Sequence, residues 1–357
     1  MSTLAVDAIV DSSNGNTATI NGATPTAYNT MGKNRIINGA MEIDQRNAGA
    51  SVTPTTSGYT LDRWQATLAA ASKFSVQQSS TAPTGFKNSL LVTSLAATTV
   101  GSSDYYLIQQ KIEGYNMADF DWGTANAKTV TLSFWVQSSL TGTFGGSLGN
   151  NAFNRTYPFT YTISSANTWE QKSITIAGDT SGTWLSTNGT GIQLTFGLGS
   201  GSTFSGTAGA WAGTGYQTAT GATQVVATNG ATFYITGVQL EVGSVATEFE
   251  RRPYGTELQL CQRYYYTTDY ASYPIGFFGT VINTANSLAN GIGMFPITMR
   301  SAPTVTMGSA DQSGVGTFTV TAQQIGTTGF NRVSSSSGNF TNNQTAVTAG
   351  FKASAEL

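Results

Sequence analysis

Segments of alternating apolar and polar residues recur along the chain, separated by short runs of Gly, Asn, Ser and Pro. In TVTLSFWVQ (129–137), four apolar residues fall on one face at a period of two, which predicts a half-buried antiparallel strand. Eight such strands are enough for a jelly-roll sandwich, and we expect one here. The other seven segments are 74–80, 88–96, 105–114, 157–163, 170–176, 192–199 and 233–241.

The two ends of this predicted sandwich differ from its middle. Residues 1–33 contain many turn formers and few aromatic residues, which predicts a short N-terminal arm of small hairpins or extended chain. From Asn34 onward, NRIINGAMEIDQR predicts a strand, a turn at Asn38-Gly39 and a second strand. We therefore expect the sandwich domain to cover residues 34–254.

Only one segment has the pattern of a helix. In TELQLCQRYY (256–265), Leu258, Cys261 and Tyr265 share a face at spacings of three and four. Alternating segments follow it, among them GIGMFPITM, PTVTM, GTFTVTA and AVTAGFKA. Residues 255–357 are thus expected to hold a short connecting helix and a smaller C-terminal β-domain. The predicted fold class is all-β.

Charge is scarce in this chain. Only 10% of the residues are charged, against about 25% in typical soluble domains, so the surface must be mostly Ser, Thr, Asn, Gln and Gly. The net charge is −2 and no basic run exceeds Arg251-Arg252, which argues against nucleic-acid binding. The Arg pair itself could bind phosphate or an acidic sugar, or clamp Glu248 or Glu250. Without an apolar stretch of roughly 20 residues or a basic leader, we expect no membrane insertion and synthesis in a cytoplasm.

The residue types present exclude much of enzyme chemistry. Histidine is absent, which removes Ser-His-Asp and Cys-His catalysis and the usual His-ligated zinc sites. The single cysteine, Cys261, excludes an intrachain disulfide. Asp119 and Asp121 are the closest acid pair, and on one strand they would point the same way, as a glycosidase could use. Such acids equally serve solubility or turn capping, and we expect no catalytic residue.

Three stretches of the sequence resemble modules of bacteriophage tail-fibre and tail-associated proteins. They are NRIINGAMEIDQRN with YTLDRW, then TFYITGVQLEVGSVATEFERRPYGTELQLCQRYY, then MFPITMRSAPTVTM, and together they cover residues 34–308. GNTATINGATPT also resembles N-terminal pieces of phage fibres. The resemblance implies a jelly roll similar to carbohydrate-binding modules within a receptor-binding protein of the virion.

This resemblance carries further expectations about assembly. It implies a homotrimeric tail fibre, made in the host cytoplasm, whose N-terminal arm joins other tail or virion proteins. The fibre would attach to a host surface glycan or lipopolysaccharide without cleaving it. The alternatives are a tailspike that depolymerises polysaccharide, and a head fibre or capsid decoration protein. Residues 309–357 resemble no such module, so receptor choice is expected there, at the tip.

Candidate ligand-binding residues are aromatic or cationic side chains in loop-like segments. Trp211 and Tyr216 lie in the long segment 200–229, which follows the alternating glycines of FGLGSGSTF, interpreted as a strand that runs into a loop. Each candidate could instead pack beneath its own loop. The remaining ligand candidates are Tyr270, Tyr273, Phe330, Arg332 and Phe340.

Two further groups of residues have interpretations of their own. The neighbouring Tyr264, Tyr265 and Tyr266 are expected to pack at an interface. The resemblance to carbohydrate-binding modules implies a structural Ca²⁺ held by Glu42, Glu241 and carbonyls around Asn38, although these could be two solvated glutamates. No other cofactor is expected.

Overall fold

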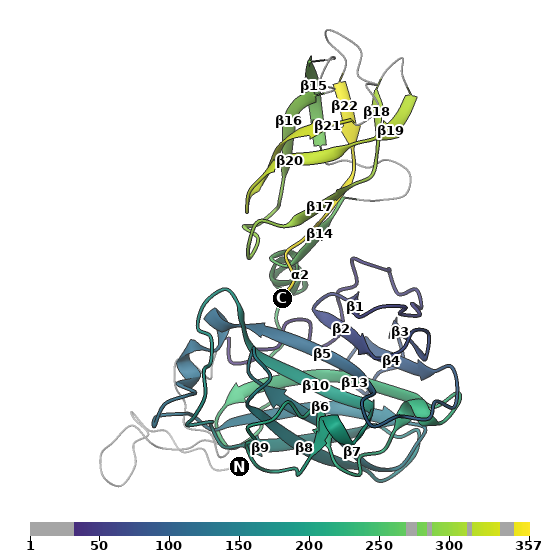
Figure 1. Cartoon of the computed structure of the whole chain (residues 1–357), viewed down its shortest axis with the longest axis vertical. Helices are drawn as coiled ribbons and strands as arrows, with labels where there is room; N and C mark the ends of the chain where they lie inside the picture. Colours follow the sequence, from purple (N-terminus) through teal and green to yellow (C-terminus); the bar gives the residue numbers. More distant parts are fainter. Residues whose placement is uncertain (1–31, 269–276, 284–287, 313–315, 336–345) are drawn as a thin grey trace, which may run out of the picture.

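The protein consists of two β-lobes stacked along its long axis (Figure 1). The computed structural model describes residues 32–268, 277–283, 288–312, 316–335 and 346–357. Most of the predicted N-terminal arm therefore lies outside the described residues. The lower lobe is an antiparallel jelly-roll sandwich and the upper lobe is a smaller β-domain, which confirms the predicted all-β class. None of the helices in the described ranges is long and apolar enough to cross a membrane.

Two antiparallel sheets face each other in the sandwich lobe. One has the strand order β1-β2-β5-β10-β7-β8 and the other β3-β4-β13-β6-β9. All eight predicted strands form, and their ends lie within two residues of the predicted ones. The strands are β1 (Gly58–Leu61), β2 (Trp64–Leu68), β3 (Phe74–Ser79), β4 (Ser89–Ser94), β5 (Tyr105–Glu113), β6 (Val130–Ser138), β7 (Gly142–Gly149), β8 (Thr156–Ile163), β9 (Glu170–Ile176), β10 (Thr190–Ser200) and β13 (Thr232–Val242).

The apolar face predicted for residues 129–137 packs into the sandwich core. Phe134 on β6 is fully buried, and its ring meets the rings of Tyr161 and Phe196 edge-on, at centroid distances of 5.0 and 5.1 Å. Burying a side chain of this size contributes about 1.5–3 kcal/mol. The period-two pattern therefore identified the face that packs into the core. The strand is more than half-buried, however, because Thr131 and Ser133 on the opposite face are buried as well.

Strands β1, β2 and β7 were not predicted. In β7, GTFGGSLG, four glycines interrupt the alternation that marks a strand. A Cβ on Gly146 would come within 2.5 Å of the Phe159 ring, so this position needs a residue without a side chain. Glycine here serves close packing, and close packing has no signature in hydropathy.

Of the strand–turn–strand predicted from Asn34 to Arg46, the two strands do not form. The start of the segment is hydrogen-bonded to β13 without joining the sheet. Arg35 N donates to Leu240 O at 2.9 Å, whereas Leu240 N donates to the side-chain Oδ1 of Asn34 at 3.1 Å. A side-chain amide thus takes the place of a backbone partner. The predicted turn is present, with Asn38 at a φ of 58°.

The upper lobe contains a three-stranded sheet, β14-β23-β17, and a seven-stranded sheet, β19-β18-β22-β15-β16-β21-β20. Strands form in all four segments predicted for this region. Their bounds are β14 (Tyr265–Thr267), β15 (Phe277–Asn283), β16 (Leu288–Met294), β17 (Thr304–Met307), β18 (Ser309–Gln312), β19 (Gly316–Thr319), β20 (Thr321–Ile325), β21 (Gly329–Ser334), β22 (Ala346–Ala349) and β23 (Phe351–Ser354).

The predicted helix connects the two lobes as α2 (Tyr254–Gln262). It ends three residues earlier than predicted, because Tyr265 already begins β14. Cys261 is fully buried and clusters with Tyr264 and Leu258. Burial raises the pKa of the Cys261 thiol well above its usual value.

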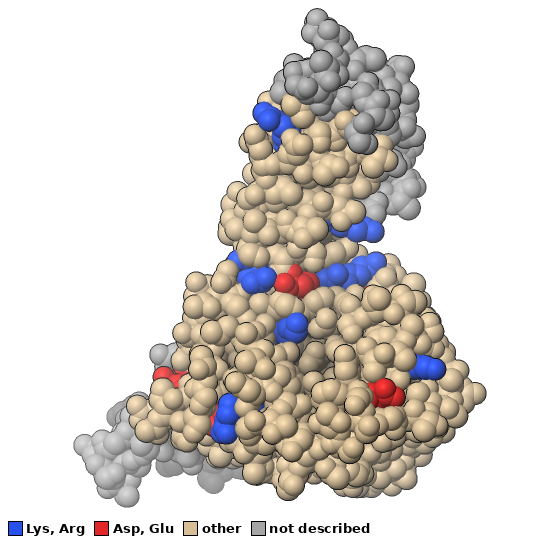
Figure 2. Space-filling view, in the orientation of Figure 1, with Lys and Arg blue, Asp and Glu red and all other residues tan. Residues whose placement is uncertain are grey.

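Charged residues gather where the two lobes meet (Figure 2). Arg263 donates to both carboxylate oxygens of Glu113, at 2.7 and 2.9 Å, and the Tyr264 hydroxyl donates to the same group at 2.6 Å. Arg46 stacks over the Tyr265 ring at 3.7 Å. The expectation that the first two tyrosines pack at an interface is thus confirmed.

The Arg251-Arg252 pair also acts within the fold. Arg252 lies 3.6 Å from the Glu250 carboxylate and 3.3 Å from that of Glu257. Arg251 stacks over the ring of Phe86, 4.6 Å from its centroid. Both side chains therefore make intramolecular contacts. Arg252 forms a clamp onto Glu250, which is one of the two interpretations given for this pair.

Candidate functional site

A pocket lies on the outer face of the six-stranded sheet, above β10 and β7. On β10, Leu194, Phe196 and Leu198 belong to the core, so Gly197 and Gly199 face outward. On β7, Phe144 points into the core and Gly145 faces outward for the same reason. The outer face of the sheet is therefore free of side chains at this point.

The long segment after β10 folds back over these glycines. It contains two 3-10 turns, η3 (Ser202–Phe204) and η4 (Val225–Ala227), and two short parallel strands, β11 (Ser205–Gly206) and β12 (Thr218–Ala219). A Cβ on Gly145 would lie 2.4 Å from Thr218 Oγ1, and one on Gly197 would lie 2.8 Å from it. Only glycine therefore lets β12 approach the sheet this closely.

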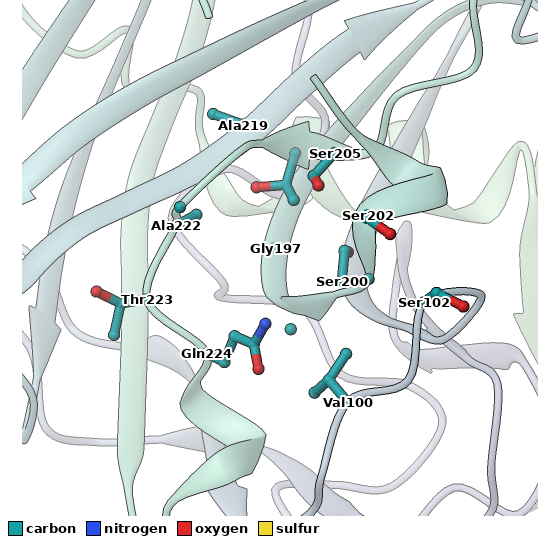
Figure 3. A pocket seen from close by; sticks show the side chains of 14 residues that line it. Val100, Ser102, Gly197, Ser200, Ser202, Ser205, Ala219, Ala222, Thr223 and Gln224 are labelled. Carbon is teal, nitrogen blue, oxygen red and sulfur yellow. The ribbon is translucent and has the colours of Figure 1, made fainter. Parts of the chain in front are cut away.

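The space between this segment and the sheet has a volume of about 350 Å³. Fourteen residues line it, all of them Gly, Ala, Val, Ser, Thr or Gln. Figure 3 shows Ser200, Ser202 and Ser205 on one side, with Ala222 and Thr223 across from them. No charged and no aromatic side chain is among the described residues that line the pocket.

Two buried polar side chains of the lining have no hydrogen-bond partner among the described residues. Ser200 and Thr218 are 8% and 3% exposed, and neither Ser200 Oγ nor Thr218 Oγ1 is paired. Gln224 also lines the pocket and is partly exposed. Buried hydroxyls are normally satisfied, because an unpaired one costs about 1–3 kcal/mol. The lining is therefore polar and uncharged, and two of its hydroxyls have hydrogen-bonding capacity that the protein leaves unused.

The chemistry of the pocket is limited to binding. No titratable side chain lines it, so the described lining offers no general acid or base. The carboxylate of Asp104, two residues after the lining residue Ser102, accepts a hydrogen bond from Gly101 N at 2.9 Å. The sequence signal for this site was the glycine alternation of FGLGSGSTF, which we had interpreted only as the end of a strand.

Trp211 and Tyr216, the ligand candidates of this segment, hold it in place. The Trp211 ring packs edge-on against Trp122 and Trp184, at 5.2 and 5.4 Å, and its Nε1 donates to Ala177 O at 2.8 Å. The Tyr216 ring covers Gly206, where a Cβ would come within 2.2 Å of it. Both rings therefore pack within the fold, which is the alternative to ligand binding that the sequence left open for these two residues.

The upper-lobe candidates divide into buried, exposed and undescribed residues. Phe330 is 3% exposed and stacks on Phe277 at 5.5 Å within the lobe's core, so its ring offers no face to a ligand. Arg332 lies on the surface, where its Nε donates to Asn290 Oδ1 at 2.9 Å. The remaining candidates lie outside the described residues: Tyr270, Tyr273 and Phe340.

Two of the residues predicted to hold calcium are engaged in hydrogen bonds within the protein. Glu241 is 1% exposed, and its carboxylate accepts hydrogen bonds from Gln239 Nε2, Thr247 N and Thr247 Oγ1, at 2.7–2.9 Å. The Asn38 side chain is engaged with Ile43 and Asp62. Glu42 and Asn38 line the same small cleft, and Glu241 is not part of its lining. The described ranges contain no cluster of three acidic or cysteine side chains placed for a metal, and calcium stays a prediction.

The acid pair considered for catalysis has a different geometry from the one expected. Asp119 lies in η2 (Ala118–Phe120), shortly after η1 (Gly114–Asn116), and Asp121 caps η2 with a φ of 55°. They therefore do not share a strand face, and the cap formed by Asp121 agrees with the alternative interpretation of turn capping. Asp119 pairs with Arg35 at 2.7 Å and Asp121 with Lys128 at 3.3 Å.

A second hollow lies at the junction of the lobes, with a volume of about 720 Å³. Its wall includes Tyr254 of α2 and Ile292 and Met294 of β16, which are 60–68% exposed. None of the buried side-chain atoms that lack a partner belongs to its lining. Unlike the pocket over β10, the described lining of this hollow therefore offers no buried, unpaired hydrogen-bonding group to a ligand.

No family model matches the sequence, and no curated protein does. Among solved structures, the enzymatically active domain of tailspike protein 4 from bacteriophage CBA120 aligns at 11% identity and a TM-score of 0.30, over 59% of this chain and 21% of that one. A family 11 carbohydrate-binding module from Clostridium thermocellum, in complex with a mixed-linked tetrasaccharide, aligns at 10% identity and a TM-score of 0.29. It covers 55% of this chain and 98% of its own. Likenesses this distant carry no inference about ligand or activity.

Proposed function

We propose that this protein is a subunit of a bacteriophage tail fibre that attaches the virion to its host by binding a cell-surface glycan, and that it cleaves nothing. The observation that carries the binding role is the pocket over β10, with its uncharged lining and two buried, unpaired hydroxyls. Ligand pockets combine such a concave surface with a few convergent polar groups. The role in the virion rests on the resemblance of residues 34–308 to tail-fibre modules.

The proposal includes a homotrimer whose N-terminal arm joins other tail or virion proteins. Light scattering on the purified chain is expected to give a mass near three times 37.3 kDa. A stable monomer at micromolar concentration would contradict a fibre. Labelling the subunit on intact virions and imaging them distinguishes a tail fibre from a head fibre or capsid decoration protein.

Attachment without cleavage is tested with host polysaccharide and lipopolysaccharide. The purified chain should bind them and compete with intact phage for adsorption, and no reducing ends should appear during long incubation. Steady release of reducing ends that disappears in Asp119→Asn or Asp121→Asn would instead identify a depolymerising tailspike. Absence of binding to both glycans and to host cells would refute the attachment role.

A further inference from the structure

We infer that the pocket over β10 binds one uncharged sugar residue of the host glycan and discriminates against acidic sugars. This inference rests on the proposed glycan-binding function and adds the chemical class of the ligand. It follows from three properties of the pocket: its charge, its unpaired hydrogen-bonding groups and its size.

The charge of the pocket favours an uncharged ligand. A carboxylate or phosphate that leaves water must find a cation or several donors, and no Lys or Arg is among the described lining residues. The carboxylate of Asp104, in the turn next to the pocket, has the wrong sign for an anionic ligand. Asp104 closes the turn that begins at Gly101 and contains Ser102, and Ser102 lines the pocket. An acidic sugar would therefore meet repulsion and no compensating ion pair.

The unpaired groups supply the recognition of hydroxyls. Ser200 ends β10, Thr218 lies on β12 and Gln224 precedes η4, so three separate segments bring polar groups to one pocket. A serine or threonine hydroxyl can donate and accept, and the Gln224 amide offers both functions as well. This matches a sugar, whose hydroxyls also donate and accept.

The size of the pocket favours a compact group over a long chain. Its volume of about 350 Å³ is at the low end of the range of small-molecule sites, roughly 300–1,000 Å³. A cavity of this size accommodates a single ring more readily than several linked ones. Since no aromatic ring lines the pocket, hydrogen bonds must orient the ligand, and weak single contacts would be strengthened by the several copies on a virion.

The test uses the full chain and small probes of defined charge. Amide resonances and calorimetry are followed with neutral methyl glycosides of glucose, galactose and mannose, and with glucuronic acid and sialic acid. At least one neutral glycoside should shift the amides of residues 197–201 and 217–224, while the acidic sugars should bind at least tenfold more weakly. Equal or tighter binding of an acidic sugar in this pocket would overturn the inference.

Variants with a matched control identify the groups responsible. Ser200→Ala and Thr218→Val should each weaken binding about five- to tenfold, because each removes one hydrogen bond to the ligand. Gln224→Ala tests the same role at a partly exposed position, where folding is not at risk. Ser147→Ala and Thr98→Val remove hydroxyls that are also buried and unpaired but lie outside the pocket, and they should leave binding unchanged.

The outcomes separate this inference from the proposed function. If the protein binds host polysaccharide while the pocket amides stay unshifted and the pocket variants bind normally, the inference is wrong and the attachment role stands. If no glycan of any kind binds, the attachment role fails and the inference fails with it.

Discussion

The buried guanidinium of Arg63, in the turn between β1 and β2, pairs with the carboxylate of Glu356 at the far end of the chain. The same guanidinium lies 3.6 Å from the centroid of the Tyr264 ring, and Arg46 binds the other oxygen of Glu356 at 2.7 Å. Residues of the sandwich thereby hold the last residues of the upper lobe. The two lobes are connected both by α2 and by this ion-pair cluster.

Glu356→Gln should destabilise the protein by about 3 kcal/mol. The side chains of Arg63 and Glu356 are 1% and 7% exposed, and removing one partner leaves a buried charge without compensation. Urea unfolding of the full chain measures the loss. Asp121→Asn makes the same carboxyl-to-amide change in the Lys128 pair, where both side chains are about 45% exposed. It should cost below about 1 kcal/mol, and equal effects of the two variants would contradict a special role for the buried pair.

The second prediction concerns Asp62 and the dependence of stability on pH. Burial raises the pKa of its carboxyl from 3.8 to about 6, against the opposing effect of Arg46. Between these values the folded protein keeps a proton that the unfolded chain loses. Lowering the pH from 7 to 4 should therefore stabilise the wild type relative to Asp62→Asn, by up to about 3 kcal/mol.

Urea midpoints of the wild type and Asp62→Asn at several pH values in this window measure the difference. Since the other carboxylates are common to both proteins, their titration cancels in the comparison. A difference that does not change with pH would show that Asp62 titrates alike in both states.

Gly145→Ala should displace β12 and abolish ligand binding in the pocket. The added Cβ would lie 2.4 Å from Thr218 Oγ1, and overpacking of this kind costs roughly 1–3 kcal/mol. The matched control is Gly58→Ala on β1, where a Cβ would meet no atom within 4 Å. The control should change stability by less than about 0.5 kcal/mol. Thermal unfolding and glycoside titration check both effects, and normal binding by Gly145→Ala would be evidence against a pocket formed beneath β12.

Exchange of lobes between related fibres locates receptor choice. The sequence predicts it in residues 309–357, but exchange of that range would also replace Glu356 and break the junction. Exchange of residues 277–349 keeps β23 and the ion pair. Because the pocket lies in the sandwich, we expect host preference to stay with the sandwich lobe in adsorption assays. Transfer of preference with residues 277–349 would instead support the tip.

The sequence by itself determined eight of the eleven strands in the two facing sheets of the sandwich, because their signal is local. Alternation at a period of two depends on neighbours along the chain, and it placed β6 and identified its buried face at Phe134. The absence of histidine excluded whole classes of chemistry without any structure. Local pattern failed where a side chain replaced a backbone partner, as the Asn34 amide does beside β13.

Only the tertiary structure decided the site. Ser200, Thr218 and Gln224 are ordinary polar residues in a loop-like sequence, and nothing local marks the two hydroxyls as unpaired. They meet because Gly145, more than 50 residues earlier, leaves room for β12 to settle on the sheet. In the same way, Phe330 resembled an exposed ring in sequence and became part of the upper core when β15 and β23 packed against it. Unpaired groups, close approaches and burial depend on distances between segments far apart in the chain, and those distances exist only after folding.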